Sequence, residues 1–112
     1  MRIHTDHNGV AVNAIHSHSD GRMVEGHEYQ ILSGPLTTTL NFQQGGVAQN
    51  GVNGITNEAL IAVLLHRVNF LNNRFPSDEN EMALAHLQSA LDQLELRTAR
   101  RMTRGVEGQE VA

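Results

Sequence analysis

Residues 56–104 contain two stretches of helical periodicity, and the short segment between them permits only a sharp turn. Apolar side chains recur at spacings of three and four in both stretches, the pattern of a helix with one packed face. Pro76 separates them and disfavours helix in the residue before it, whereas Ser77 is a good residue to begin the next helix. Two helices joined so closely run antiparallel, so the sequence predicts a helical hairpin.

Both helices have clear start and stop signals. Thr56 is a good N-cap for the first helix, which should end by Phe75. The second helix begins after Ser77 and extends from about Asp78 to Arg104, roughly 40 Å at 1.5 Å per residue. This second helix is the longer one and should therefore overhang the first.

The end of the second helix and its packing face are also indicated. Gly105 is the natural C-terminal cap. The packing seam repeats at alternating spacings of three and four, and we expect Met102 to extend it. Its members are Leu84, Leu87, Leu91, Leu94 and Thr98.

Residues 1–54 differ sharply, being rich in Gly, Asn, Ser, Thr and His, and they predict strands and turns. Asn8-Gly9 is typical of a two-residue type I′ hairpin, Ser19-Asp20-Gly21 marks a second turn, and Gly34-Pro35 a third. The glycine-rich segment 45–54 is expected to be a loose connector. The expected strands are Ile3–Thr5, Val10–Ile15, Tyr29–Leu32 and Leu36–Phe42.

The predicted class is therefore α+β: a small N-terminal antiparallel β-sheet followed by a C-terminal antiparallel two-helix hairpin. The organisation is a β-rich, Gly- and His-rich region at 1–54, a hairpin at 55–108 and a flexible tail at 109–112, forming one domain overall. The first half has so little apolar mass that the helices or another subunit should cover it, which favours an oligomer.

Charge and composition exclude several functional classes. The chain has 12 acidic residues against 8 basic ones, a net charge of −4, which argues against a binder of nucleic acid polymers. It has no cysteine, no apolar stretch near the ~20 residues that cross a bilayer and no leader-like start, so we expect a cytoplasmic protein without membrane contact. The sequence contains no P-loop, GxGxxG or GxSxG motif, so no motif in it indicates catalysis.

The arginines are unevenly distributed. The chain contains no lysine, and Arg97, Arg100, Arg101 and Arg104 fall within an arc of about 100° on the second helix. A planar guanidinium can grip a phosphate with two hydrogen bonds, so one interpretation is a phosphate site beside the apolar seam. The alternative is that these cations only complement the helix dipole in its last turns.

Two further groups leave alternatives open. Phe70 and Phe75 near the interhelical turn would stack on a base or simply close the hairpin core, and Asn80 would cap its helix or face a ligand. His16 and His18 lie on one face of a strand and, with Asp20 or His4, would offer ligands to zinc or nickel, although their spacing matches no established metal motif. We expect no metal and no other cofactor to be required.

The second half resembles a helical-hairpin family common in bacteriophages, which includes "sponge" proteins that block CBASS and Thoeris immunity. Those proteins bind cyclic oligonucleotides or cyclic ADP-ribose isomers without degrading them, and they assemble as hexamers. The β-rich first half is similar to the Thoeris-blocking branch. The resemblance rests on Gly54-Ile55-Thr56-Asn57-Glu58-Ala59-Leu60, on Glu79-Asn80 with Ala83-Leu84, and on Arg97-Thr98, Arg101 and Arg104-Gly105-Val106-Glu107-Gly108.

The resemblance implies a non-enzymatic protein, most simply a homo-hexamer in the cytoplasm of the infected host, whose partners are cyclic nucleotide signals. It implies that Arg97 and Arg101 grip phosphates, that Asn80 hydrogen-bonds the ligand and that Phe70 stacks on a base. The remaining candidate ligand-binding residues are Arg104, Phe75, Arg67 and His66. The alternative function is a structural or regulatory phage protein whose arginine face binds an acidic partner.

Overall fold

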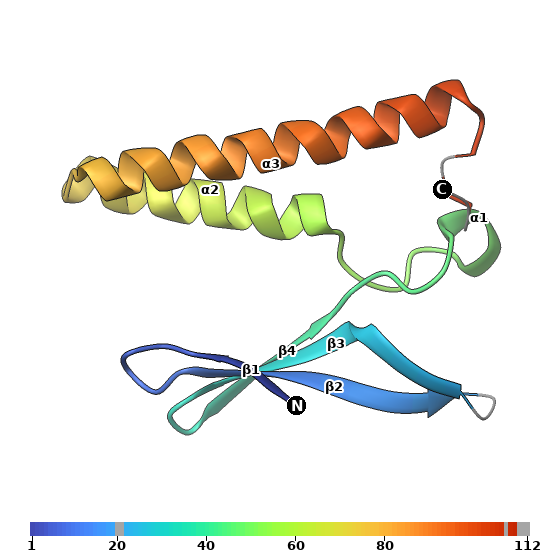
Figure 1. The fold of residues 1–112 in the computed structure, drawn as a ribbon, viewed down its shortest axis with the longest axis horizontal. Coiled ribbons are helices and arrows are strands. Elements are labelled where there is room, and N and C mark those ends of the chain that lie inside the picture. The colour runs from blue at the N-terminus through green and yellow to red at the C-terminus, as the bar shows by residue number, and fades with distance from the viewer. Residues whose placement is uncertain (20–21, 107, 110–112) are drawn as a thin grey trace. The chain divides into compact units, whose positions relative to one another are not determined.

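A computed structural model describes residues 1–19, 22–106 and 108–109. The chain divides into two units, Met1–Ile55 and Thr56–Ala112, here called the sheet unit and the hairpin unit. The sheet unit contains four strands and a short helix, and the hairpin unit contains two long helices (Figure 1). The predicted α+β class, an antiparallel sheet followed by a helical hairpin, is confirmed.

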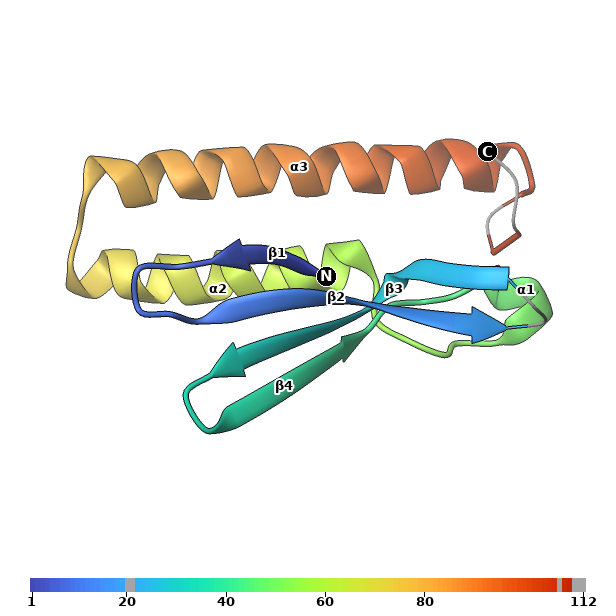
Figure 2. The ribbon, with the colours of Figure 1, turned by 60° about the horizontal axis from the view of Figure 1, so that its bottom comes forward.

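The sheet is a four-stranded antiparallel meander of order β1-β2-β3-β4, formed by β1 (Arg2–Thr5), β2 (Ala11–Ser19), β3 (Arg22–Ser33) and β4 (Leu36–Asn41). Figure 2 shows β1 beside β2 and the long hairpin of β3 and β4. Gly34 and Pro35 connect Ser33 to Leu36, its cross-strand partner. The positive φ of Gly34, 58°, fits the first central position of a type II′ turn.

The first turn differs from the predicted two-residue type I′ loop at Asn8-Gly9. The Gly9 N–H donates to the carbonyl of Asp6 at 3.1 Å, so His7 and Asn8 are the central residues, and Gly9 follows with a φ of 79°. The carboxylate of Asp6 accepts hydrogen bonds from the backbone N–H groups of Asn8 at 2.8 Å and Val10 at 3.0 Å. This side chain selects the longer loop, because an aspartate can organise a turn through its own backbone neighbours.

Strand β3 is much longer than the predicted Tyr29–Leu32, and it contains an irregularity. Ile15 pairs with Glu28 and Ser17 pairs with Val24, so a single residue of β2 faces three residues of β3. Gly26 lies in this bulge with a φ of 84°, a conformation that favours glycine. The turn predicted at Ser19-Asp20-Gly21 falls partly on residues 20–21, outside the described residues.

The connector after β4 is ordered, contrary to the loose segment expected from its glycines. Gln43 donates from its side chain to the carbonyls of Gly45 and Gly51. Within the connector lies the short helix α1 (Val47–Asn50). Gly54 passes so close to β4 that an added Cβ would lie 2.5 Å from the backbone of Phe42. Only glycine fits there, because a real Cβ would require the backbone to shift.

The hairpin unit consists of α2 (Asn57–Arg74) and α3 (Asp78–Thr103), which pack side by side (Figures 1 and 2). The predicted caps are confirmed: the hydroxyl of Thr56 accepts from Ala59 N–H, and that of Ser77 accepts from Asn80 N–H. With 26 residues against 18, α3 overhangs α2 as predicted. Among the described residues, no helix is long and apolar enough to span a membrane.

The turn between the helices is held by a buried amide. Asn72 is 7% exposed, and its side chain accepts from the backbone N–H of Ser77 at 3.1 Å while donating to the carboxylate of Glu81. The amide thus joins the end of α2 to the first turns of α3. Burial makes these hydrogen bonds important, because a buried polar group that loses its partner is destabilising.

The apolar core of the described chain is thin. Ala11 and Ala14 are the only buried hydrophobic residues among those described, and the seam of α3 is only half-buried. Large apolar side chains are exposed in both units, including Leu36, Val63, Phe75, Met82 and Met102. A chain of this size gains little stability from such a core, which is the physical basis for expecting self-association.

We predict that Asn72→Ala destabilises the hairpin by about 1–3 kcal/mol, since it removes both hydrogen bonds and leaves Glu81 without this donor. Asn73→Ala is the matched control, because Asn73 is exposed on the next position of the same helix. Urea or thermal unfolding measures both. Equal stability of the two variants would contradict the role given to Asn72.

We also predict that the turn at Asp6 is sensitive to acid. Backbone N–H donors, first Val10 and then Asn8, lower the pKa of Asp6 below its ordinary range. A carboxyl group with a lowered folded-state pKa contributes stability that is present above its unfolded pKa and is lost as pH falls through the folded value. Melting temperature should therefore decline below about pH 5, and less so in Asp6→Asn. Identical pH profiles for the two proteins would refute this.

Candidate anion-binding site

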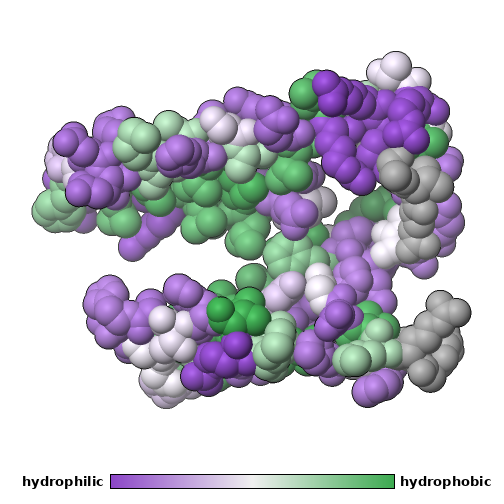
Figure 3. Space-filling view, viewed as in Figure 1, coloured by the Kyte–Doolittle hydropathy of each residue, from purple (hydrophilic) through white to green (hydrophobic). Residues whose placement is uncertain are grey.

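The C-terminal part of α3 gathers four arginines around one pocket. Their spacing of three and four residues places the side chains on one side of the helix, as the sequence predicted. The pocket has a volume of about 230 Å³. Figure 3 shows strongly hydrophilic residues at this end of α3, beyond the apolar residues along the middle of the hairpin. The pocket is lined by Gln93, Leu96, Arg97, Arg100, Arg101 and Arg104.

Arg100 belongs to this pocket although the family resemblance did not assign it a role. The sequence indicated Arg100 through its position within the same 100° arc of the helix as the other three arginines. Arg97, Arg100 and Arg104 are exposed, so their guanidinium groups can turn toward a ligand. None of the six lining residues is acidic, and the polar groups among them are four guanidinium groups and one amide. This arrangement favours an anion with several oxygen acceptors.

Arg101 differs from its neighbours because it is only 5% exposed. It lies three residues after Thr98 and continues the alternating spacing of the seam. Met102, which we expected to extend the seam, is instead 65% exposed, so that expectation was wrong. Three of the four arginines therefore lie beside the seam, whereas Arg101 lies within it.

The partners of Arg101 lie in the chain that follows α3. The helix ends with Gly105 at a φ of 73°, while the N–H groups of Gly105 and Val106 donate to the carbonyls of Met102 and Arg101 at 3.0 Å each. This double hydrogen bond reverses the chain, as the glycine cap predicted. The Arg101 guanidinium then donates to the carbonyl of Val106 at 2.9 Å and to that of Gln109. The flexible tail predicted at 109–112 otherwise falls on residues 110–112, outside the described part.

Three of the other candidate residues lie at the opposite end of the hairpin, around its turn. Phe70 is 47% exposed and Phe75 is 67% exposed, so neither ring closes the hairpin core within one chain. The guanidinium carbon of Arg74 lies 5.4 Å from the centre of the Phe75 ring. The side chain of Asn80 donates a long hydrogen bond of 3.4 Å to the carbonyl of Phe75, which ties it to the turn.

The last two candidates lie on α2. Arg67 and His66 are exposed, and His66 lines a groove of about 540 Å³ formed by both helices together with residues such as Asn69, Glu81 and Gln88. Arg67 does not line this groove. The structure thus places neither residue in the arginine pocket.

The two groups of candidates are separated by the length of α3. Arg97 follows Asn80 by 17 positions on one continuous helix, a rise of about 25 Å at 1.5 Å per residue. A small signal molecule bound by Arg97 cannot also reach Asn80 of the same chain. Either the groups have different roles, or residues of two chains meet at one ligand.

The histidine-rich strands do not assemble a metal site in the described part of the chain, where no three His, Cys, Asp or Glu side chains gather suitably. His16 instead lies 3.2 Å from the carboxylate of Glu25. Asp20, one of the suggested third ligands, lies outside the described residues.

Comparisons with known proteins identify the family of the chain. Residues 38–99 match the protein family described as Acb2/Tad1, hairpin domain, which confirms the resemblance expected from the motifs. A protein named "Thoeris anti-defense 1" from Bacillus phage SBSphiJ7 is 49% identical over 71 residues, or 62% of this chain and 50% of the relative. The chain therefore spans about half the length of the curated relative that it matches.

We predict that Arg101→Ala lowers the free energy of unfolding by about 1.5–3 kcal/mol, the range for hydrogen bonds from a charged donor. The control Arg100→Ala should lower it by less than ~1 kcal/mol, because an exposed cation in a last turn contributes mainly through the helix dipole. Thermal unfolding compares the variants, and amide hydrogen exchange at Val106 reports the release of the tail. Equal losses in the two variants would show that Arg101 does not hold the tail.

Proposed function

Because the chain belongs to the Acb2/Tad1 hairpin-domain family, we propose that it is a phage anti-defence protein that binds cyclic nucleotide immune signals and sequesters them without cleavage. The relative named Thoeris anti-defense 1 supports action against Thoeris immunity. The resemblance described above then implies cyclic ADP-ribose isomers as one signal class. Cyclic oligonucleotides of CBASS systems are the other class. The protein would act in the cytoplasm of the infected bacterium, where these signals are produced.

The arginine pocket is the observation that carries this proposal. Cyclic nucleotide signals have two or more phosphate groups, and each presents oxygen atoms to planar guanidinium groups. Arg97, Arg100 and Arg104 are exposed around the pocket and would supply these contacts. Arg101 lines the same pocket while holding the tail, so it would bind phosphate from a fixed position.

The residues at the hairpin turn are suited to the base of such a ligand. The exposed rings of Phe70 and Phe75 offer stacking surfaces, and the amide of Asn80 offers hydrogen bonds. His66 and Arg67 lie exposed on the same helix as Phe70 and would contribute at the edge of the site. No residue in this set forms a nucleophile and base pair, and the proposed action is binding alone.

Both groups can act on one ligand only if two chains contribute to the site. We propose a homo-oligomer, most simply a hexamer, in which the arginine end of one α3 meets the turn end of another. The half-buried seam and the exposed apolar side chains of the hairpin, among them Val63, Leu64 and Met82, supply surface for this association. Two antiparallel copies of α3 related by a twofold axis would create two equivalent sites.

We predict that Arg97→Ala weakens binding of a cyclic nucleotide by about ten- to a hundredfold, the loss of one or more hydrogen bonds to a charged group. Arg97→Lys should recover only part of the affinity, because lysine retains the charge but lacks the planar fork. Isothermal titration against cyclic di- and trinucleotides and cyclic ADP-ribose isomers measures these changes. Arg2→Ala is the control, since Arg2 is an exposed arginine of the sheet unit and belongs to neither group of proposed contacts.

Thermal melts establish that the variants remain folded, as expected for an exposed position. Unchanged affinity in Arg97→Ala would show that the arginine pocket is not part of the binding site. Failure of the parent protein to bind any of these ligands would instead favour the alternative, in which the arginine face binds an acidic partner protein. Conversion of the ligand during the titration would show that the protein is an enzyme.

A further inference from the structure

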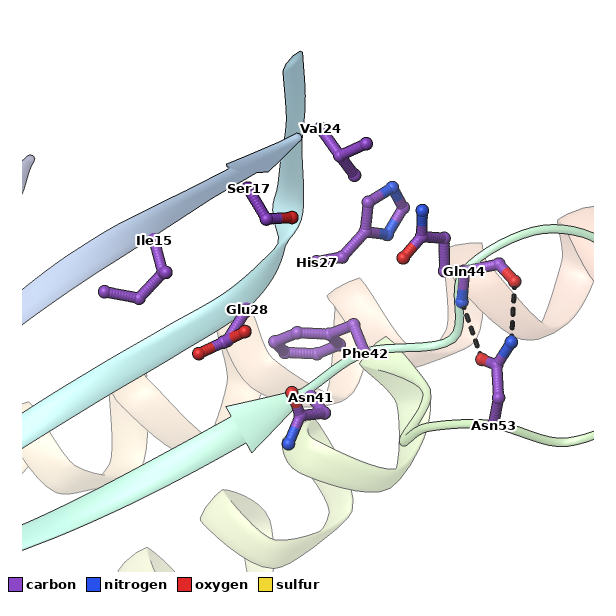
Figure 4. A pocket seen from close by; sticks show the side chains of 9 residues that line it. All are labelled: Ile15, Ser17, Val24, His27, Glu28, Asn41, Phe42, Gln44 and Asn53. Carbon is purple, nitrogen blue, oxygen red and sulfur yellow. Dashed lines mark hydrogen bonds between the residues drawn. The ribbon is translucent and has the colours of Figure 1, made fainter. Parts of the chain in front are cut away.

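The sheet unit contains a cavity of its own, which shares no residue with the arginine pocket. It has a volume of about 350 Å³, within the range of small-molecule sites. All of its lining residues belong to the sheet unit and come from β2, β3, the end of β4 and the connector. Figure 4 shows these side chains around one space, with the ring of Phe42 and the carboxylate of Glu28 among them.

The bulge in β3 shapes one wall of this cavity. Where one residue of β2 faces three of β3, the regular ladder is interrupted, and His27 lies in the interrupted stretch. The carbonyl of His27 accepts from the N–H of Phe42 at 2.7 Å, which fixes the bulge against the end of β4. Bulges commonly redirect a side chain toward a site, and here the His27 side chain lines the cavity.

The opposite wall is fixed by hydrogen bonds within the connector. The side chain of Asn53 accepts from the N–H of Gln44 at 2.9 Å and donates to the carbonyl of the same residue at 2.8 Å (Figure 4). The ring of Phe42 is oriented by Tyr29, with the two rings nearly perpendicular and their centres 5.7 Å apart. Both walls are therefore formed before any ligand binds, which reduces the ordering entropy lost on binding.

The polar groups of the cavity indicate the class of ligand. Within the described part of the chain, the side chains of Ser17, His27 and Gln44 make no hydrogen bond to protein, so their donors and acceptors remain for a ligand. No arginine lines the cavity, and Glu28 supplies a carboxylate, so a phosphate group is disfavoured. An aromatic ring, an amide, an imidazole and a carboxylate together suit a neutral planar heterocycle that donates through an amino group.

We propose that this cavity is a second binding site, which takes an amine-bearing nucleobase or its nucleoside without a phosphate. Phe42 would pack against the heterocycle, Glu28 would accept from its amino group, and His27 and Gln44 would hydrogen-bond its ring edge. The proposal does not depend on signal capture at the arginine pocket, because the two sites use different residues of different units.

Titration of the full chain with adenosine, monitored through NMR chemical shifts, tests the proposal. Saturable shifts at the cavity residues are expected. His27→Ala and Gln44→Ala should each weaken binding about three- to tenfold, the effect of one lost hydrogen bond. His18→Ala should leave binding unchanged, because this exposed histidine of β2 does not line the cavity.

Inosine tests the role of Glu28, because inosine has a carbonyl group where adenosine has the amino group that Glu28 would accept from. The parent protein should prefer adenosine, and Glu28→Gln should reduce that preference, since an amide can donate to the carbonyl of inosine. The proposal is overturned if adenosine gives no saturable shifts, or if His27→Ala and Gln44→Ala, both shown to be folded, bind it like the parent. Loss of adenosine binding in Arg97→Ala but not in His27→Ala would place the nucleoside in the arginine pocket instead.

Discussion

The packing of α2 against α3 determines where the candidate binding residues of the hairpin unit lie. The buried amide of Asn72 holds the two helices at their turn, and the half-buried leucines of α3 continue the contact along the hairpin. Because α3 is one unbroken helix of 26 residues, it keeps its two ends at a fixed separation. In the proposed function, the arginines at one end and the aromatic and amide groups at the other would form two rigid halves of a binding surface. Rigid elements position a site more precisely than loops, and this would suit the proposed role of holding a ligand.

The thin core of the described chain favours the proposed association of several copies. Two buried alanines are the only buried hydrophobic residues in the described ranges, whereas many larger apolar side chains face solvent. Association would bury these side chains and, in the same contact, bring the arginine end of one α3 to the turn end of another. Assembly and ligand binding would then be coupled, because a ligand that touches two chains stabilises the oligomer by mass action.

Local signals predicted the helical hairpin well, and contacts with segments outside each predicted element account for what they missed. The caps at Thr56, Ser77 and Gly105 could be predicted because each acts on backbone groups a few residues away. The burial of Arg101 could not be predicted from hydrophobicity, although its place in the seam repeat was visible. Its burial depends on carbonyl groups in the tail, and no local pattern reports such a contact. The length of β3 was missed because Gly26 and nearby charged residues interrupt the strand pattern, whereas pairing with β2 continues across the bulge.

Subunit mixing tests most directly whether a captured signal is shared between two chains. Asn80→Ala and Arg97→Ala proteins, each expected to bind the ligand weakly on its own, would be co-expressed with different tags. The doubly tagged oligomers would then be titrated with the cyclic nucleotide that the parent protein binds. If Asn80 of one chain and Arg97 of another meet at each ligand, random mixing of equal amounts restores about a quarter of the sites to parental affinity. If mixed oligomers form and no high-affinity site is recovered, the two residues do not complete a site between chains, and the central claim of a shared site is contradicted.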